Sequence, residues 1–156
     1  MRRLPALITL AVLAGCAVPV GGGDTAGRTD AVERVVDGDT VDLRSLGRAR
    51  VIGVDTPEVY GGAECFGREA SAYAKRRLPS GTEVTYELGA DPRDRYDRTL
   101  VYLRAGGRMF NEDLLEAGYA TPLAIEPNTR YEERFDRLAT RAAGRHRGIW
   151  GACPRP

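Results

Sequence analysis

Apolar and polar residues alternate along several short stretches of the chain, which is the pattern of strands with one buried face. Turn-forming residues separate these stretches, among them the "DGDT" at 37–40 and the Gly106-Gly107 pair. We therefore predict five strands, which cover residues 31–36, 40–46, 48–54, 82–88 and 99–105.

Three other stretches have the apolar spacing of helices, at 64–78, 111–118 and 129–148. Asn111 is expected to cap the start of the second helix and Gly118 to end it. The third helix is amphipathic, and its predicted apolar stripe consists of Tyr131, Phe135, Leu138 and Ala142.

The order of these elements is three strands, a helix, two strands and two helices, which defines an α+β fold. Five short strands in one small domain cannot leave both edges of their sheet open. We therefore predict a closed or partly closed five-stranded β-barrel with three α-helices packed on it.

The first residues do not share this pattern. Residues 1–16 hold two arginines, a short apolar run and small residues before Cys16, which is typical of a secretory signal. The sequence "LAGC" resembles the lipobox of bacterial lipoproteins, which predicts a lipid anchor on Cys16; cleavage after Ala17 is the alternative. Residues 17–30 predict a flexible tether, and residues 31–153 the folded domain. We expect an extracytoplasmic protein, either anchored to the membrane or secreted.

The sequence has 23 Lys and Arg residues against 22 Asp and Glu, with a formal net charge of +1. A chain so close to neutral has no long-range attraction for polyanions, so any nucleic-acid site must be a local cluster of charge. With Cys16 assigned to the signal, Cys65 and Cys153 remain. An even pair in an exported protein predicts a disulfide, and two unpaired buried thiols are the alternative.

Carboxylates gather near the ends of two predicted strands. "VVDGDTVDL" supplies Asp37, Asp39 and Asp42, and "VDTPE" supplies Asp55 and Glu58. Carboxylates brought together repel one another unless a cation or a proton lies between them. Oxygen donors without a nearby histidine or thiol suit Ca²⁺ or Mg²⁺.

Two arginines complete this group. Arg50 and Arg98 carry the planar guanidinium fork that fits a phosphate. Acids, a divalent ion and arginines together favour binding of a phosphodiester and stabilisation of its transition state. Strict alternation would place Arg50 and Asp55 on opposite faces of a strand, so the prediction requires a bulge or bend at Gly53.

Five motifs resemble the staphylococcal nuclease (thermonuclease) family, in the same order and at similar spacing: "VVDGDTVDL", "RVIGVDTPE", "DRYDRTLVYL", "NEDLLEAGYA" and "RGIW". They cover about residues 31–150. The resemblance implies an OB-fold barrel with three helices. It also implies a calcium-dependent nuclease that cleaves DNA or RNA at the 5′ oxygen and leaves 3′-phosphates.

The resemblance further implies roles for residues of the acidic cluster. Asp39 and Asp55 match the calcium-binding carboxylates of the family, and the main-chain carbonyl of Thr56 matches a third ligand. Asp37 and Thr40 match positions just outside the metal ligands.

Three more matches concern the reaction itself. Glu58 matches the residue usually assigned as general base, and Arg50 and Arg98 match the arginines that hold the phosphate. The chain departs from the family after its second helix, where Leu123 and Ile125 stand in place of tyrosines that stack on a nucleotide.

Another departure is Asp97, which stands where a glycine is common and adds a negative charge near the phosphate site. The alternatives to an enzyme are an OB-fold module that binds nucleic acid or protein without catalysis and a calcium-stabilised structural lipoprotein. Because every matching catalytic position is filled, we favour the enzyme, acting as a monomer.

Overall fold

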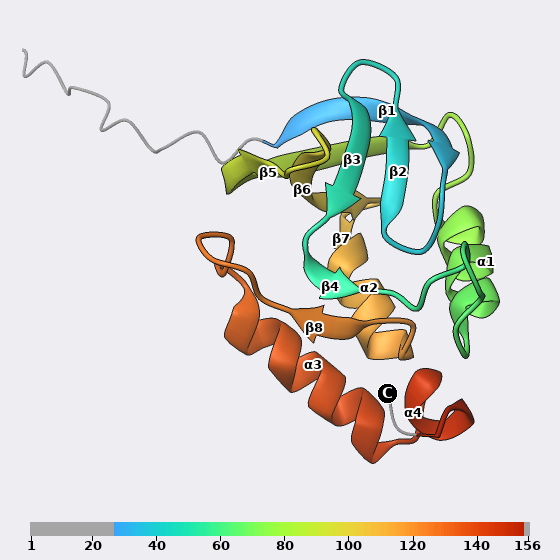
Figure 1. Ribbon diagram of the computed structural model, residues 1–156. Coiled ribbons are helices and arrows are strands. Elements are labelled where there is room, and N and C mark those ends of the chain that lie inside the picture. Colours follow the sequence, from blue (N-terminus) through green and yellow to red (C-terminus); the bar gives the residue numbers. More distant parts are fainter. Residues whose placement is uncertain (1–26, 155–156) are drawn as a thin grey trace, which may run out of the picture.

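The computed structural model describes residues 27–154, so the predicted signal, its Cys16 and most of the predicted tether lie outside the described residues. A curved sheet dominates the structure (Figure 1). Its main strands are β1 (Arg28–Val35), β2 (Thr40–Leu43), β3 (Gly47–Val51), β5 (Glu83–Arg93) and β6 (Thr99–Ala105). They lie in the order β3-β2-β1-β5-β6, and β3 also pairs with β6. This last pairing closes the predicted five-stranded barrel.

The closing pair is parallel, whereas the neighbouring pairs in the barrel are antiparallel. Arg50 lies opposite Leu100, and Val51 opposite Val101. β3 and the start of β6 therefore share one seam of the barrel, which brings the two predicted phosphate-binding arginines to the same region.

A second, two-stranded sheet was not predicted. It consists of β4 (Gly53–Asp55) and β8 (Thr121–Leu123), and β7 (Arg108–Met109) adds a short edge to β6. β8 comes from the segment that departs from the family pattern, and its pairing with β4 fixes that segment beside the metal-binding candidates.

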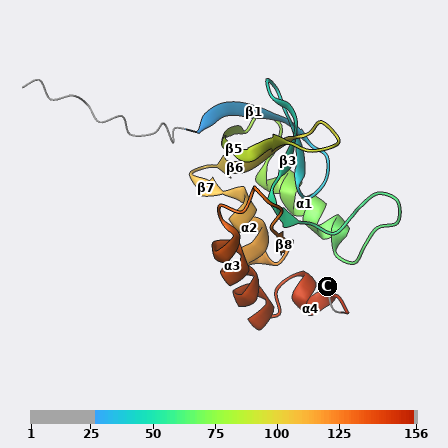
Figure 2. The ribbon, with the colours of Figure 1, turned by 60° about the vertical axis from the view of Figure 1, so that its left-hand side comes forward.

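The three predicted helices are present, followed by a short fourth one. They are α1 (Gly67–Arg77), α2 (Phe110–Ala117), α3 (Glu132–Gly144) and α4 (Ile149–Ala152). Both views show α2, α3 and β8 gathered at one end of the barrel (Figures 1 and 2). The predicted stripe of α3 is confirmed, because Phe135, Leu138 and Ala142 are buried. None of the described helices is long and apolar enough to cross a membrane.

The cysteine prediction is confirmed. Cys65 and Cys153 form a disulfide with an S–S distance of 2.06 Å, across a sequence separation of 88 residues. The bond joins the segment before α1 to the residue that follows α4.

The folded part begins earlier than predicted, because residues 28–31 already pair with β5. Asp30, assigned from the sequence to the tether, is only 9% exposed. Its carboxylate accepts N–H groups of Ala31, Ser45 and Leu46 at 2.7–3.2 Å. Burial alone would raise the pKa of Asp30, but these hydrogen bonds outweigh it and hold the pKa below its usual value.

We expect Asp30→Ala to lower the free energy of unfolding by about 1–3 kcal/mol at neutral pH, because it removes a charged acceptor from three partly buried hydrogen bonds. A carboxyl with a lowered pKa stabilises the fold above its unfolded pKa and loses this effect as the pH falls. The difference between the variant and the wild type should therefore shrink towards acid pH. Urea unfolding at two pH values measures it, with Thr29→Ala, an exposed site on the same strand, as control.

Asn111 corrects a second prediction. It does not cap α2, because Met109 holds the N-cap position and Asn111 lies within the helix, fully buried. Its amide donates to the carbonyl of Ile52 at 2.7 Å and accepts the N–H of Leu103 at 3.0 Å. Asn111 thus joins α2 to β6 and to the bend between β3 and β4.

We expect Asn111→Ala to lower the free energy of unfolding by about 2–4 kcal/mol, since it leaves two buried backbone groups unpaired and a small cavity. Urea unfolding checks this, with Glu116→Ala on the more exposed side of α2 as control. A loss below about 1 kcal/mol would show that the hydrogen bonds of Asn111 contribute little.

Candidate active site

The predicted bend at Gly53 is present and brings the predicted arginine and carboxylate together. β3 ends at Val51, and β4 starts at Gly53 with φ of +76°, a conformation that favours glycine. A Cβ at this position would also meet the ring of Phe135 at 2.5 Å. Because the chain turns here, Asp55 folds back towards β3, and one of its oxygens lies 2.9 Å from Nη2 of Arg50.

Asp39 lies at the centre of the site, and its side chain is only 8% exposed. One carboxylate oxygen accepts the N–H and the hydroxyl of Thr56, both at 2.8 Å, and lies 2.9 Å from Nη1 of Arg50. Burial raises the pKa of Asp39 to about 6, although the Arg50 guanidinium acts in the opposite direction. Among residues 27–154, the other oxygen has only a long contact of 3.4 Å, with the Thr40 hydroxyl.

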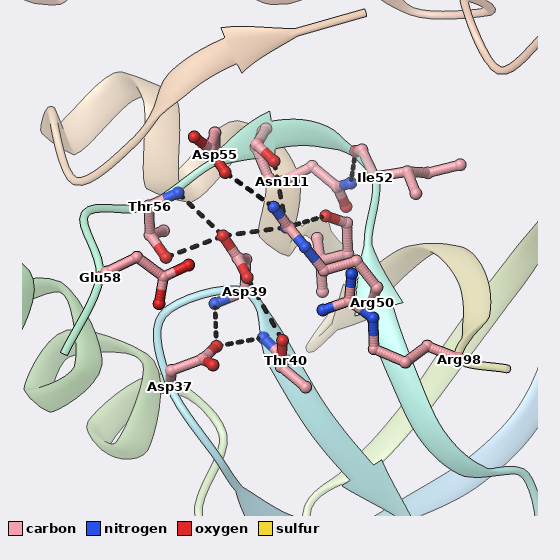
Figure 3. A network of polar contacts seen from close by, with 12 residues as sticks. Asp37, Asp39, Thr40, Arg50, Ile52, Asp55, Thr56, Glu58, Arg98 and Asn111 are labelled. Atoms are coloured by element: carbon pink, nitrogen blue, oxygen red, sulfur yellow. Dashed lines mark hydrogen bonds and ion pairs between the residues drawn. The ribbon is translucent and has the colours of Figure 1, made fainter. Parts of the chain in front are cut away.

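Arg50 holds the two carboxylates and the bend in one network (Figure 3). Its Nη1 donates to the carbonyls of Val51 at 2.8 Å and Val54 at 3.1 Å. The same guanidinium forms the ion pairs with Asp39 and Asp55, and its side chain is 13% exposed. Asp39 and Asp55 therefore meet around the guanidinium of Arg50, and their assignment as metal ligands stays a prediction.

Hydrogen bonds within the "DGDT" turn, residues 37–40, hold the backbone of Asp39. The Asp37 carboxylate accepts the N–H groups of Asp39 at 3.1 Å and Thr40 at 2.7 Å, so it shapes the turn itself. Gly38 packs directly on Thr56, where a Cβ would approach the threonine side chain to 2.5–2.7 Å. Asp37 thus orders the turn that carries Asp39, and the Thr40 hydroxyl approaches the Asp39 carboxylate at 3.4 Å.

Glu58 follows Thr56 on the exposed rim of the site. Figure 3 shows its side chain pointing towards the space between Thr56 and Asp37. Within the described part of the chain its carboxylate has no hydrogen-bond or ion-pair partner, in contrast to those of Asp39 and Asp55. Glu58 is thus the carboxylate of this cluster that is available to a reactant.

Arg98 reaches the site from the opposite side, towards Arg50 (Figure 3). It does not approach the acidic cluster but pairs with Asp94 at 2.7 Å, and Asp94 also accepts its backbone N–H at 3.0 Å. Asp97, which adds a negative charge near this site, pairs with Arg93 at 2.7 Å on the exposed surface.

A cleft of about 320 Å³ lies between the two predicted phosphate-binding arginines. Arg50 and Arg98 both line it, together with Leu123 and Ile125, which are 40% and 62% exposed. The exposed ring of Tyr96 lies 5.4 Å from the guanidinium carbon of Arg98. The cleft therefore combines an apolar wall with four arginines, which are accompanied by the carboxylates of Asp91, Asp94 and Glu126. Arginines beside an apolar wall suit a phosphate linked to a flat base.

Two residues that shape this cleft were not predicted from the sequence. Asp94 orients Arg98, and the i,i+4 spacing of the two residues is the signal that could have revealed the pair. Asn128 accepts the N–H of Asp91 and donates to its carbonyl, both at 3.0 Å, so it holds the end of β5. A lone asparagine in a loop gives no comparable signal.

The donors at the acidic end fit a hard cation. Among residues 27–154, no three His, Cys, Asp or Glu side chains lie close enough together to hold one metal ion. A metal here would therefore take the Asp39 and Asp55 carboxylates with a main-chain oxygen such as that of Thr56, and complete its shell with water. An all-oxygen set of this kind suits Ca²⁺ or Mg²⁺ and not zinc.

Comparison with known proteins agrees with this geometry. The model of the family described as staphylococcal nuclease homologue matches residues 48–152. The thermonuclease of Staphylococcus hyicus is 38% identical over 129 residues, which cover 79% of this chain and 76% of that protein. The thermonuclease of Staphylococcus intermedius is 35% identical over 133 residues, with 81% and 79% covered. Endonuclease YncB of Bacillus subtilis is 33% identical over 127 residues, with 76% and 60% covered. This chain therefore belongs to the staphylococcal nuclease family.

Proposed function

We propose that this protein is a calcium-dependent nuclease that hydrolyses phosphodiester bonds of DNA or RNA and leaves 3′-phosphates. The observation that carries the proposal is the network in which Arg50 joins Asp39 and Asp55, with Glu58 beside it and Arg98 across the cleft. The names of the thermonuclease and endonuclease relatives support the same activity.

Asp39, Asp55 and the carbonyl of Thr56 are the proposed calcium ligands. When bound, calcium would neutralise the two carboxylates and supply positive charge next to the phosphate. The side chains of Asp37 and Thr40 keep Asp39 in place, as their contacts in the turn indicate. Calcium is preferred over magnesium by analogy with the family, since the oxygen donors alone fit both ions.

The reaction is proposed to use three side chains of this chain. Arg50 and Arg98 hold the phosphate oxygens and stabilise the charge that develops on them as the phosphorus becomes five-coordinate. Glu58 accepts a proton from a water molecule whose oxygen attacks the phosphorus. The bond to the 5′ oxygen then breaks, this oxygen takes up a proton, and the phosphate remains on the 3′ side.

Arg50 and Arg98 must partly exchange their present partners for the phosphate. In the structure without substrate, Arg50 pairs with Asp39 and Asp55, and Arg98 pairs with Asp94. Asp39 and Asp55 would hold the metal ion in place of Arg50, whose fork would then be directed at the substrate. The ion pairs with Asp39 and Asp55 thus hold Arg50 next to the proposed phosphate site.

The protein is proposed to act outside the cytoplasm. The Cys65–Cys153 disulfide supports this location, because disulfides persist mainly in oxidising compartments. A lipid anchor on Cys16 would hold the enzyme at the membrane, and cleavage after Ala17 would release it. Mass spectrometry of the mature N-terminus decides between these two forms.

Metal dependence tests the function directly. We expect the purified protein to degrade DNA with added calcium, to lose activity in EDTA and to regain it when calcium is restored, with 3′-phosphate ends in the products. Equal cleavage in EDTA would contradict the proposed role of calcium. Binding of nucleic acid without cleavage would point to a binding module, and a higher melting temperature in calcium without either would point to a structural lipoprotein.

A further inference from the structure

Hydrogen bonds between Glu58 and Glu64 close the loop that follows Glu58, the proposed base. We define it as the Glu58 loop, residues 59–65, which joins the end of the site to α1; Figure 2 shows this connection extending beyond the barrel. The N–H of Glu58 donates to the Glu64 carboxylate at 3.0 Å, and the N–H of Glu64 donates to the carbonyl of Glu58 at 2.9 Å. The two residues thus hold each other through both backbone groups of Glu58.

The start of α1 packs against the same point. The N–H of Gly67 donates to the carbonyl of Glu64 at 3.1 Å. A Cβ on Gly67 would clash with the Glu58 carbonyl and lie 3.0 Å from that of Pro57. The base of the loop is therefore compact, and a displacement of Glu64 would be transmitted to Glu58.

The disulfide fixes Glu64 through the neighbouring residue. Cys65 is bonded to Cys153, whose N–H donates to the carbonyl of Ile149 at 3.0 Å. The N–H of Ile149 in turn donates to the carbonyl of Gly118 at 2.9 Å, at the end of α2. This chain of contacts ties the Glu58 loop to the helices below the barrel.

The side chain of Glu58 depends on these backbone contacts for its position. Its carboxylate is exposed and has no hydrogen-bond or ion-pair partner among the described residues, so only its own backbone holds it beside the cluster. Glu64 is itself exposed, and its carboxylate has one hydrogen-bond partner in residues 27–154, the N–H of Glu58. The Glu64 carboxylate can therefore hold the backbone of Glu58 without competition from another contact among the described residues.

We propose that Glu64, anchored by the Cys65–Cys153 disulfide, is a positioning residue that aims Glu58 at the attacking water. The proposal rests on the proposed nuclease function. Misplacing a catalytic group by about 1 Å can cost about 100-fold in rate. Loss of the Glu64 carboxylate should therefore lower kcat and leave KM largely unchanged, because the groups proposed to bind the phosphate are not touched.

The test compares Glu64→Ala with Glu64→Gln, which keeps an oxygen that can accept the Glu58 N–H. We expect kcat for DNA cleavage in calcium to fall about 10- to 100-fold in Glu64→Ala and less than about threefold in Glu64→Gln. Glu69→Ala removes an exposed carboxylate of the next helix and serves as the matched control, with unchanged kcat. Amide exchange of Glu58 should be faster in Glu64→Ala than in wild type, a readout independent of activity.

A double variant, Cys65→Ser with Cys153→Ser, tests the anchor. We expect the same fall in kcat, measured below the melting temperature of the variant, and a similar fall when the wild type is reduced. An active wild type with Glu64→Ala at full kcat would overturn the positioning role and leave the nuclease function standing. A rise in KM alone, or an equal loss in Glu64→Gln, would also overturn it. A wild type without calcium-dependent cleavage would overturn both proposals.

Discussion

Replacing Arg50 by lysine should lower kcat/KM for DNA cleavage by about 10³-fold while the chain stays folded. The guanidinium donates to the carbonyls of Val51 and Val54 and pairs with Asp39 and Asp55. A lysine has one compact ammonium group and no planar fork, so it cannot serve these four acceptors or hold a phosphate with two parallel bonds. The substitution thus keeps the positive charge and removes the planar arrangement of donors.

The same strand offers a matched control. Arg48 also pairs with a carboxylate, that of Asp42 at 2.8 Å, but its side chain is 48% exposed and lies outside the cleft. Arg48→Lys should alter kcat/KM by no more than about twofold. Cleavage of a fluorescent oligonucleotide gives the rates, and circular dichroism reports folding. An Arg50→Lys enzyme within tenfold of wild type would show that the charge of Arg50 suffices.

Replacing Glu58 by glutamine should lower kcat by about 10³-fold, because an amide cannot take a proton from water near neutral pH. The fold should not change, since the Glu58 carboxylate has no partner in residues 27–154 and its backbone contacts are kept. Affinity for calcium and for a nucleoside bisphosphate should stay close to that of wild type. Single-turnover kinetics measure the rate of cleavage, and calorimetric titration measures the affinities for calcium and the nucleoside bisphosphate.

Glu33→Gln is the control for this substitution, because Glu33 is an exposed carboxylate on β1 and does not line the cleft. It should leave kcat unchanged. If Glu58→Gln retained most of its kcat, Glu58 would not be the base. If it lost calcium affinity instead, Glu58 would belong with the metal ligands.

Much of the fold follows from local pattern. The alternation of apolar residues located the five barrel strands, and Gly53 located the bend that brings Asp55 back to Arg50. These features rest on short-range chemistry: strand periodicity, and a backbone conformation that glycine adopts at little cost. The disulfide between Cys65 and Cys153 was predictable because only two cysteines follow the predicted signal.

The missed features depend on contacts between distant segments. Asn111 stands where a helix cap would be expected, yet its amide donates to Ile52, 59 residues away in sequence. β4 and β8 have three residues each, and pair only because the barrel and α3 bring them together. Asp30 was assigned to a flexible segment because several glycines precede it. Its carboxylate accepts N–H groups of Ser45 and Leu46, about 15 residues away, and no local pattern predicts this contact.

The parallel pairing of β3 with β6 affects when, during folding, the candidate active site can form. Arg50 is paired in register with Leu100, two residues beyond Arg98, so the two arginines come to the same seam only when segments about a third of the chain apart have met. Contacts of such sequence separation form slowly. A chain whose barrel has not yet closed would thus carry every residue of the candidate site without the arrangement that activity requires.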